Sequence, residues 1–241
     1  MYCNQMNSFR GGRIGKAEPF RLLPYERKVS RCREYWAVFQ LTDMFAGRIL
    51  LAYVFADMIR RKNVTGLYTP AYKPTGDEIA VIDTNKGTIR VQLAGLDAPI
   101  HVGNFVELAQ KGYYDNLKFH RYVPNFVIQG GCPYTRDMTP EAVARGERGP
   151  EGRPGTGGPG YQIKGEWRTN PHNEHNDGTL AMARSQMPDS AGSQFYFCLG
   201  PQPFLDSDYT VFGQTIEGLD VIGTLRAGDV IEHIEIENAS E

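Results

Sequence analysis

FHRYVPNFVIQGG, residues 119–131, is the most informative stretch of the 241-residue chain, because it carries polar side chains inside a run that is otherwise apolar. Arg121 and Gln129 flank the apolar residues of this run, and unpaired polar groups are costly to bury. A second stretch, DSAGSQFYFCLG at 189–200, has the same character, with Gln194 at the entry of a strand. We therefore expect both stretches to be strands whose polar side chains perform chemistry rather than fill a core.

The sequence around these stretches has the pattern of a β-protein. EIAVIDTNKGTIRVQL predicts a hairpin with strands at 79–83 and 88–93 and a turn at 85–87, since β-branched residues occupy alternate positions. Apolar residues at helical spacing, followed by Gly112, predict one amphipathic helix over 99–111. Further short strands are expected at 123–128, 180–183, 195–199, 211–212 and 230–236. Many short strands with few helices predict a mainly β fold, a closed antiparallel structure.

The formal charge of -2 is a cancellation between two parts of different character. Residues 1–76 hold 13 Lys and Arg against 5 Asp and Glu, whereas residues 77–241 hold the other 13 basic residues and 23 acidic ones. We predict a basic N-terminal extension at 1–68, a Pro/Gly linker at 69–76 and a folded domain at 77–241. The basic arm 1–35 could touch nucleic acid or anionic lipid, but a solvated tail fits better, and neither partner is assigned.

The N-terminal extension contains one long apolar stretch, residues 36–59, which Asp43, Arg48 and Asp57 interrupt. Each charge at the centre of a bilayer costs roughly 2.5–3.5 kcal/mol, so we expect no membrane span. Three interpretations stay open: a docking helix, a segment upstream of the true start, and a targeting signal or anchor at 27–59. The four cysteines form no CxxC pair, which predicts reduced thiols and a cytoplasmic protein, or an exported one if 27–59 is a signal or anchor.

Other patterns point less clearly to function. Gly at every third position over 146–160 matches a collagen strand, but five triplets without partner chains predict a long mobile loop. His172 and His175 fall short of the three or four ligands of a metal site, so we prefer a polar turn to a metal-dependent hydrolase. With only two candidate ligands, no metal is expected. The sequence also has no Walker motif and no nucleophile elbow, so neither phosphate binding nor acyl transfer is indicated.

FHRYVPNFVIQGG and DSAGSQFYFCLG resemble the two signature blocks of the cyclophilin family of peptidyl-prolyl cis-trans isomerases. The similarity is collinear from about Asp77 to Ala239 and includes GTGG at 155–158, GTLAMA at 178–183 and VFG at 211–213. The resemblance implies a closed eight-stranded antiparallel β-barrel capped by two α-helices, with the substrate groove on its outer face. It also implies a monomeric enzyme without a cofactor, acting on proline-containing peptides and on unfolded or folding proteins.

The same resemblance assigns roles to individual residues. Arg121, Phe126 and Gln129 are the expected catalytic residues. Arg121 would donate to the prolyl nitrogen of the twisted amide, and Gln129 would hold the substrate backbone and orient Arg121. The expected socket for the proline ring consists of Phe126, Val127, Tyr196 and Leu205. The complete set of expected substrate-binding residues is His120, Val127, Gly155, Ala183, Arg184, Ser185, Gln194, Tyr196, Phe204, Leu205 and Tyr209.

Several of these positions differ from many eukaryotic members of the family. Phe204 stands where they carry Trp, Val127 where they carry Met, Tyr196 where they carry Phe, and Tyr209 where they carry His. The missing indole N–H at Phe204 predicts weak binding of cyclosporin-type macrocycles. Arg184, where the family often has Asn, adds a cation that could favour acidic residues before proline. A proline-binding adaptor or chaperone module with little catalysis is the alternative function.

Overall fold

The computed structural model describes residues 66–238. The predicted extension at 1–68, with its apolar segment 36–59 and the alternative signal at 27–59, therefore lies almost entirely outside the described residues. Within the described range, no helix is both long enough and apolar enough to cross a bilayer. The compact unit that contains the described residues begins at Val64.

An antiparallel hairpin begins the sheet, which confirms the sequence prediction. β1 (Glu78–Thr84) pairs with β2 (Gly87–Leu93) through a two-residue turn at 85–86. Ile82 lies opposite Ile89, and both side chains are fully buried. Because successive side chains of a strand point to opposite faces, the alternating β-branched residues line one buried face.

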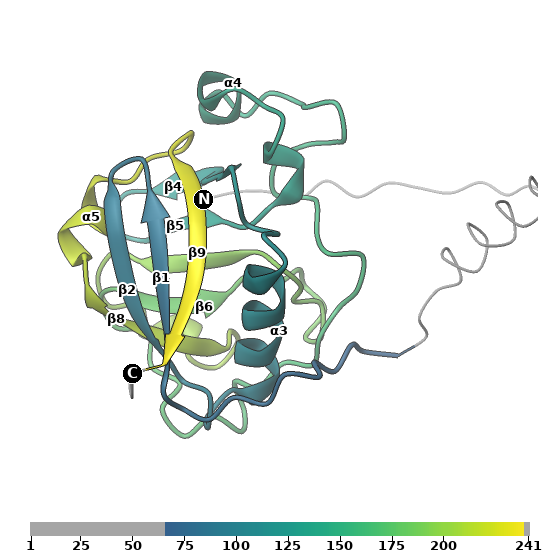
Figure 1. The fold of residues 1–241 in the computed structure, drawn as a ribbon, viewed down its shortest axis with the longest axis vertical. Helices are drawn as coiled ribbons and strands as arrows, with labels where there is room; N and C mark the ends of the chain where they lie inside the picture. Colours follow the sequence, from purple (N-terminus) through teal and green to yellow (C-terminus); the bar gives the residue numbers. More distant parts are fainter. Residues whose placement is uncertain (1–65, 239–241) are drawn as a thin grey trace, which may run out of the picture. The chain divides into compact units, whose positions relative to one another are not determined.

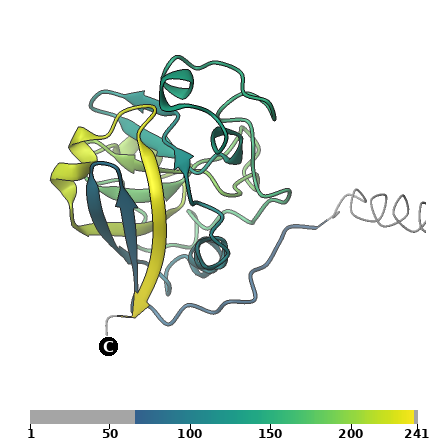
Figure 2. The same cartoon turned by 45° about the horizontal axis from the view of Figure 1, so that its top comes forward.

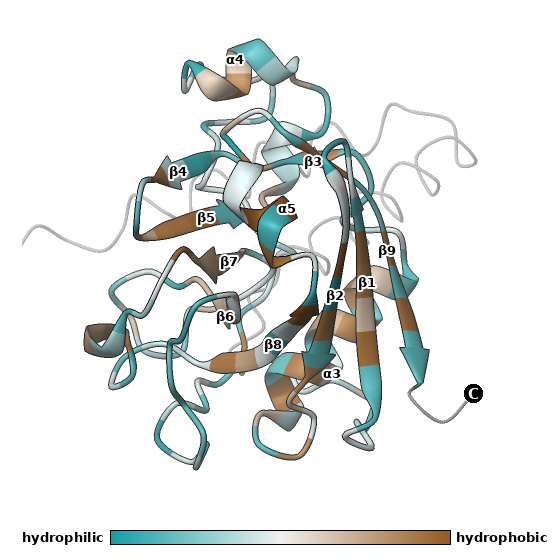
Figure 3. Ribbon diagram, turned by 90° about the vertical axis from the view of Figure 1, so that its left-hand side faces the viewer, coloured by the Kyte–Doolittle hydropathy of each residue, from teal (hydrophilic) through white to brown (hydrophobic). Residues whose placement is uncertain are grey.

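Seven more strands complete the sheet. They are β3 (Leu117–Lys118), β4 (Arg121–Val123), β5 (Val127–Gly130), β6 (Thr179–Met182), β7 (Phe195–Cys198), β8 (Val211–Glu217) and β9 (Val230–Asn238). All nine form one antiparallel sheet in the order β3-β9-β1-β2-β8-β6-β7-β5-β4. Figure 3 shows this sheet curling round, with hydrophobic segments along β1, β2, β5 and β7.

A single extended segment joins the two ends of this strand order. β3 and β4 are the outermost strands of the sheet, but only Phe119 and His120 separate them in the chain. The amide of Phe119 donates to the carbonyl of Asp229 (2.9 Å), and the amide of His120 donates to the carbonyl of Gln129 (2.9 Å). Residues 117–123 therefore switch partner from β9 to β5 within one run. Counted as one strand, this run completes the closed eight-stranded barrel that the resemblance implies.

Two helices cover the barrel, as the resemblance also implies. α3 (Pro99–Gln110) packs against β9, and α5 (Leu219–Thr224) packs against β2 (Figures 1 and 2). Pro99 suits the first helical turn because that turn needs no N–H donor. α5 begins after Gly218, whose φ of 84° is accessible to glycine at no steric cost. A short helix, α4 (Pro140–Ala144), follows β5.

Aromatic rings fill the inside of the barrel. Phe105 of α3 lies 5.1 Å from Tyr114, 5.7 Å from Phe195 and 5.3 Å from Phe212, measured between ring centroids. All four residues are fully buried. Their tilted and edge-on arrangements match the preferred geometry of aromatic pairs. The side chains on one face of each strand point into this core. The alternate side chains therefore lie on the outer face of the barrel.

Residues 69–76, predicted as a linker, are extended but pack against α3. Glu107 of α3 accepts hydrogen bonds from the phenol of Tyr68 and from the amide of Tyr72 (3.0 Å). Buried backbone N–H groups need such partners, so the carboxylate holds this stretch in place. We call residues 67–76 the strap.

Two expectations about strands need correction. The run 123–128, predicted as one strand, is divided: Val123 ends β4, residues 124–126 form a tight turn, and β5 begins at Val127. Asn125 in that turn has φ of 56°. β8 and β9 extend beyond the predicted 211–212 and 230–236. Their outer residues are exposed, so polar side chains continue the strands past the apolar runs that the sequence shows.

The glycine-rich loop 146–160 packs closely on Tyr134. A Cβ atom at Gly152 would lie 2.6 Å from the Tyr134 ring, and one at Gly157 would lie 3.0 Å from it. A Cβ atom at Gly152 would displace the ring, and one at Gly157 would be tighter than most real contacts, so both positions favour glycine. The collagen-like spacing is therefore incidental to a packed loop.

Candidate active site

Backbone pairing places four residues in one row across the sheet. Arg121 on β4 lies opposite Gln129 on β5, Gln129 lies opposite Tyr196 on β7, and Tyr196 lies opposite Ala181 on β6. Directly opposed residues point to the same face of a sheet, and their neighbours along each strand point to the other face. Ile128, the neighbour of Gln129, belongs to the barrel core. The row therefore faces outward, as expected for the substrate site.

Apolar side chains beside this row form a second cluster, separate from the barrel core. We call it the outer cluster. Its buried members are Val127, Ala181, Tyr196, Cys198, Leu205 and Val211, and Phe126, Ala183 and Tyr209 pack against them partly buried. Leu205 comes from a 3₁₀ helix, η3 (Pro203–Leu205). The outer cluster unites all four residues of the predicted proline socket.

Phe204 and Phe126 form an open aromatic pair at this cluster. Their rings stack with centroids 5.7 Å apart and planes inclined by 22°. Phe204 is 65% exposed although it is a large apolar residue. An exposed ring beside the outer cluster suits the substrate groove that the resemblance implies.

Arg121 lies exposed at the end of the row. Its guanidinium carbon is 5.6 Å from the centroid of the Phe126 ring. Within residues 66–238 the guanidinium of Arg121 forms no hydrogen bond or ion pair, so its donors are available to a bound molecule. The side chain of Gln129 donates to Gln194 (2.9 Å), and no orienting contact from Gln129 to Arg121 is found in the described part of the chain.

Gln194 connects the row to the glycine-rich loop. Its side-chain amide donates to the carbonyls of Gly155 (2.9 Å) and Gly157 (2.8 Å). His120 packs beside Gly155, where a Cβ atom would lie 3.2 Å from the imidazole ring. Burial lowers the pKa of His120 to about 4, against an opposing contribution from Gln194 and with a further lowering by the charge of Arg121. His120 is therefore neutral near pH 7.

Arg184 is enclosed by the chain around it. Its side chain is only 11% exposed and pairs with Asp208 (3.1 Å). The guanidinium carbon lies 4.8 Å from the ring centroid of Tyr209 and 5.4 Å from that of Trp167. The guanidinium also donates to the carbonyl of Ser185 (2.9 Å). These contacts already compensate the charge that the sequence suggested as a determinant for acidic substrates.

A buried histidine without an assigned role contacts Tyr196. Nε2 of His175 is 3.0 Å from the phenol oxygen of Tyr196, and Nδ1 is 2.7 Å from Oδ1 of Asp206. The interpretation as a polar turn fits His172, whose side chain is 79% exposed and pairs with Asp97, but not His175, whose side chain is fully buried. The two histidines thus have different partners, and residues 66–238 contain no group of three or more His, Cys, Asp or Glu that could hold a metal ion.

Sequence reasoning also missed three apolar members of the outer cluster. They are Ala181, Cys198 and Val211. For Ala181 a signal exists: in GTLAMA (178–183) it alternates with residues of the barrel core, so a period of two assigns it to the outer face. No comparable signal exists for His175, because its polar neighbours are typical of a turn.

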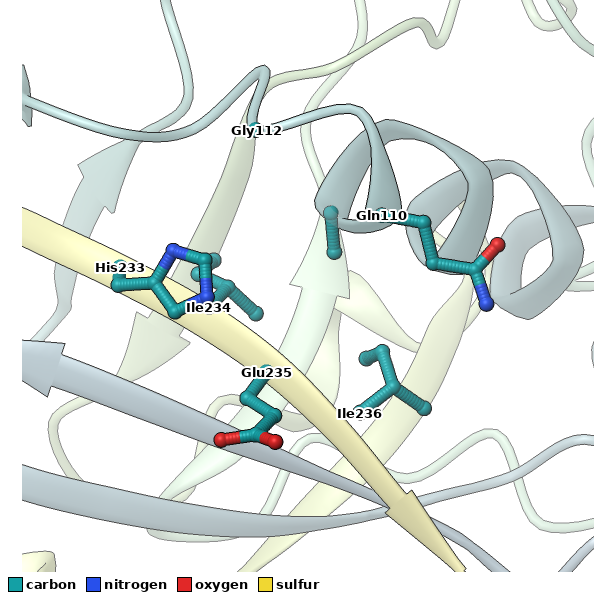
Figure 4. A pocket seen from close by; sticks show the side chains of 7 residues that line it. Gln110, Gly112, His233, Ile234, Glu235 and Ile236 are labelled. Carbon is teal, nitrogen blue, oxygen red and sulfur yellow. The ribbon is translucent and has the colours of Figure 1, made fainter.

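A separate pocket of about 240 Å³ lies between the end of α3 and β9 (Figure 4). Gln110, Gly112 and His233 are among the residues that line it. It contains no residue of the row or of the outer cluster. The residues predicted to bind substrate therefore do not belong to this pocket.

Comparison with known proteins agrees with this geometry. Residues 79–240 match the family described as cyclophilin type peptidyl-prolyl cis-trans isomerase/CLD. A peptidyl-prolyl cis-trans isomerase of Synechococcus elongatus is 45% identical over 159 residues, which cover 65% of this chain and 94% of that protein. One of Helicobacter pylori is 43% identical over 157 residues, 64% of this chain and 84% of that protein. Isomerase B of Bacillus subtilis is 41% identical over 155 residues, 64% and 93% of the two chains.

Solved structures show the same fold. A cyclophilin type peptidyl-prolyl cis-trans isomerase of Cryptosporidium parvum, crystallised in the presence of the dipeptide Ala-Pro, superposes with a TM-score of 0.51 at 28% identity. The match covers 66% of this chain and 99% of that one. A cyclophilin of Hirschia baltica also has a TM-score of 0.51 at 22% identity, over 66% of this chain and 74% of that one, and shows the fold alone.

The matched region begins in β1 and ends just after β9, so it spans the whole barrel together with the row and the outer cluster. The curated relatives are matched over most of their own length. The chain belongs to the family of cyclophilin-type peptidyl-prolyl cis-trans isomerases.

Proposed function

We propose that Arg121 and the outer cluster carry out the isomerase reaction of this chain on proline-containing peptides and on unfolded or folding proteins. The observation that supports the proposal most strongly is the position of Arg121. An exposed guanidinium, without a partner inside the described chain, lies at the end of a row whose neighbours are apolar and aromatic. A charged donor beside an apolar cluster suits a substrate with a polar amide and an apolar ring.

The chemistry needs no bond to break. The C–N bond of an amide has partial double-bond character, and rotation about it faces a barrier of about 18–20 kcal/mol. In the twisted state the prolyl nitrogen is pyramidal and regains a lone pair. A fixed donor aimed at that nitrogen stabilises the twisted amide more than the planar one, which is the condition for catalysis. Arg121 fills this role because its guanidinium stays protonated and presents several donors.

The outer cluster provides the complementary part of the site. Phe126, Val127, Tyr196 and Leu205 would hold the pyrrolidine ring, which has no donor of its own. Gln129 and Gln194, linked by a hydrogen bond, would hold the substrate backbone next to the ring. Ala183, Arg184 and Ser185 would form the wall for the residues before proline. The Ala-Pro dipeptide present with the Cryptosporidium parvum relative supports a substrate of this class.

We propose a reducing compartment, the cytoplasm, as the site of action. Cys132 and Cys198 are buried free thiols in the described chain. Free buried thiols are more common in proteins of a reducing compartment, where disulfides seldom persist. Fractionation of cells with an antibody against the barrel tests this proposal, and recovery outside the cytoplasm would contradict it.

A kinetic comparison of two arginine variants tests the role of Arg121. A hydrogen bond to a charged group contributes about 1.5–3 kcal/mol, and each 1.4 kcal/mol changes a rate tenfold. We therefore expect Arg121→Ala to lower kcat/KM for an Ala-Pro peptide by about 100-fold in the full chain. The matched control is Arg226→Ala, which removes another exposed arginine whose guanidinium lies over an aromatic ring, that of Tyr122 at 4.4 Å. The control should keep the activity of the wild type.

The pH profile gives a second check on the same assignment. The guanidinium does not titrate near neutral pH, and the lowered pKa of His120, about 4, keeps that imidazole neutral above pH 5. We expect kcat/KM to be nearly constant between pH 6 and 8. Arg121→Ala with unchanged activity, or a bell-shaped profile centred near pH 7, would overturn the assignment.

A further inference from the structure

His175 lies between two parts of the outer cluster, the strand that carries Tyr196 and the segment that carries Leu205. Its Nε2 atom is 3.0 Å from the phenol oxygen of Tyr196, and the two rings are nearly parallel, with planes inclined by 15° and centroids 6.1 Å apart. Its Nδ1 atom is 2.7 Å from Oδ1 of Asp206, which also accepts the backbone N–H of His175 (2.8 Å). Asp206 directly follows Leu205.

We propose that His175 is a positioning residue of the isomerase: it holds the ring of Tyr196 and thereby the surface against which the proline ring binds. The proposal rests on the proposed function of the outer cluster. His175 acts through Tyr196 and does not touch substrate itself.

The proton positions in this network follow from the donor and acceptor inventory. An ionised carboxylate only accepts, so the imidazole donates from Nδ1 to Asp206. The Nε2 lone pair is then free to accept the phenol proton of Tyr196. Burial lowers the pKa of His175, against the opposing effect of Asp206, and burial raises the pKa of Tyr196. Both groups therefore keep the protonation states that this arrangement needs at neutral pH.

The phenol of Tyr196 makes such a partner necessary. Tyr196 is 4% exposed and lies among apolar side chains of the outer cluster. A hydroxyl group buried there without a partner would be costly, and it would draw the ring toward any available polar group or water. His175 satisfies the hydroxyl and also fixes where the ring lies, so the histidine and the tyrosine act as a pair.

The turn at residues 173–175 also forms hydrogen bonds with the segment that carries Leu205 and Tyr209. Nδ2 of Asn173 donates to the carbonyls of Asp206 (2.6 Å) and Tyr209 (2.9 Å), and the amide of Gln202 donates to the carbonyl of His175 (2.7 Å). Residues 173–175 thus connect the strand that carries Tyr196 to the segment that carries Leu205 and Tyr209. Loss of the His175 contact should loosen the fit of the proline ring while leaving Arg121 in place. The expected kinetic effect is on KM rather than on kcat.

Two isosteric substitutions separate the contacts of the two ring nitrogens. His175→Gln can keep a polar atom near the Nε2 position and so a partner for Tyr196, whereas His175→Asn can keep one near the Nδ1 position and so the contact to Asp206. We expect His175→Asn to raise KM for an Ala-Pro peptide by about fivefold, consistent with one lost buried hydrogen bond, with kcat within twofold of the wild type. His175→Gln should restore most of the affinity. His172→Gln, which changes the exposed histidine of the same turn, is the control and should leave KM unchanged.

A double-mutant cycle tests whether His175 acts through the phenol. Tyr196→Phe removes only the hydroxyl group. We expect His175→Asn to raise KM about fivefold in the wild type but by less than twofold in the Tyr196→Phe background, because the interaction is then already lost. Equal effects in both backgrounds, or equal KM values for His175→Asn and His175→Gln, would overturn the proposal.

A measurement on the unsubstituted full chain covers the case in which a variant does not fold. The ¹⁵N resonances of the His175 imidazole should show a protonated Nδ1 and an unprotonated Nε2, and the Nε2 resonance should shift on addition of Ala-Pro peptide, with His172 as an internal reference. An unchanged Nε2 resonance at saturating peptide would contradict the proposal. Failure of the proposed function is seen separately, because it appears as full activity of Arg121→Ala, whatever the KM ratio of the His175 variants.

Discussion

Arg121 and Arg184 are both adjacent to the outer cluster, but their guanidinium groups have different surroundings. Arg184 is almost fully enclosed and bound to Asp208 and to backbone carbonyls. Arg121 has no such partner within residues 66–238 and lies beside Phe126. A guanidinium can stabilise a transition state only with donors that are free to reach it. The contacts of the two side chains, and not their residue type, therefore support the proposed roles, catalysis for Arg121 and a substrate-lining position for Arg184.

Phe204 leads to a prediction about large cyclic ligands. Trp at this position would keep the stack on Phe126 and add an indole N–H donor at an exposed site. We expect Phe204→Trp to bind a cyclosporin-type macrocycle about fivefold more tightly than the wild type, as one added hydrogen bond suggests. Titration calorimetry measures the difference. Leu96→Trp, which adds an indole at another exposed position, is the control, and equal affinities of Phe204→Trp and the wild type would contradict the prediction.

The strap shows how one helix holds an extended segment. Glu107 of α3 accepts hydrogen bonds from Tyr68, Ala71 and Tyr72. Burial alone would raise the pKa of Glu107, but these hydrogen bonds and the charge of Lys111 outweigh it and lower the pKa. A carboxylate whose pKa is lowered by folding stabilises the folded state above its unfolded pKa, near 4.5, and loses this effect as the pH falls through the folded value.

Because folding lowers the pKa of Glu107, we expect the stability of the protein to depend on pH in acid. We expect Glu107→Gln to lower the free energy of unfolding by about 1–3 kcal/mol at pH 7, and by progressively less below pH 4.5, where the wild type loses the same charge. Urea unfolding at pH 7, 5 and 3.5 measures both quantities. Glu141→Gln, at an exposed glutamate of α4, is the matched control. A deficit of Glu107→Gln that stays constant over this pH range would argue against the carboxylate contacts of the strap.

At this scale, the sequence predicts regular elements better than their ends. The β1–β2 hairpin and α3 are confirmed because periodicity of two and of 3.6 appears directly in their residues. The division of 123–128 by a turn was not predicted, although Pro124 and Asn125 are turn-favouring residues, because the apolar residues on both sides of them suggested one strand. The packing of the strap was not predicted either, since Pro and Gly mark both linkers and extended packed segments.

For the whole molecule, closure of the barrel depends on a single run of seven residues. Residues 117–123 pair with β9 at one end and with β5 at the other. Phe119 lies at the switch between the two partners and is fully buried. β3 pairs only with β9 and β4 only with β5, but one continuous run carries both strands, so neither outer strand detaches independently. We therefore expect the barrel to unfold in one transition.

Phe119→Ala tests this dependence. Removal of a fully buried Phe side chain costs about 3–5 kcal/mol, and here it also weakens the joint between the two edges. We expect near-ultraviolet circular dichroism and isomerase activity to be lost together at a lower denaturant concentration than in the wild type. Phe204→Ala, which removes an exposed ring, should shift stability by less than about 1 kcal/mol. Separate transitions for the two signals in Phe119→Ala would contradict the claim that closure of the barrel depends on residues 117–123.

The division into two faces explains what the sequence could predict of the site. Arg121, Gln129 and Gln194 stood out because polar groups within apolar strands need a reason. The strand register brings Arg121 and Gln129 into one row with Tyr196, which only the family resemblance had assigned to the site. His175 and Asp206 were beyond reach, because their contact joins two loops that are 31 residues apart in the chain. Local patterns contain no information about such a contact.

Exchange spectroscopy by NMR on an Ala-Pro peptide tests the central claim most directly, because one sample reports both binding and isomerisation. With the full-length wild type, cross-peaks between the cis and trans forms should appear at catalytic concentrations of protein. With Arg121→Ala, the peptide resonances should still shift on binding. The rate of cis–trans exchange obtained from the cross-peaks should fall by about 100-fold. Binding without exchange in the wild type, as a proline-binding adaptor would show, or undiminished exchange in Arg121→Ala, would contradict the account.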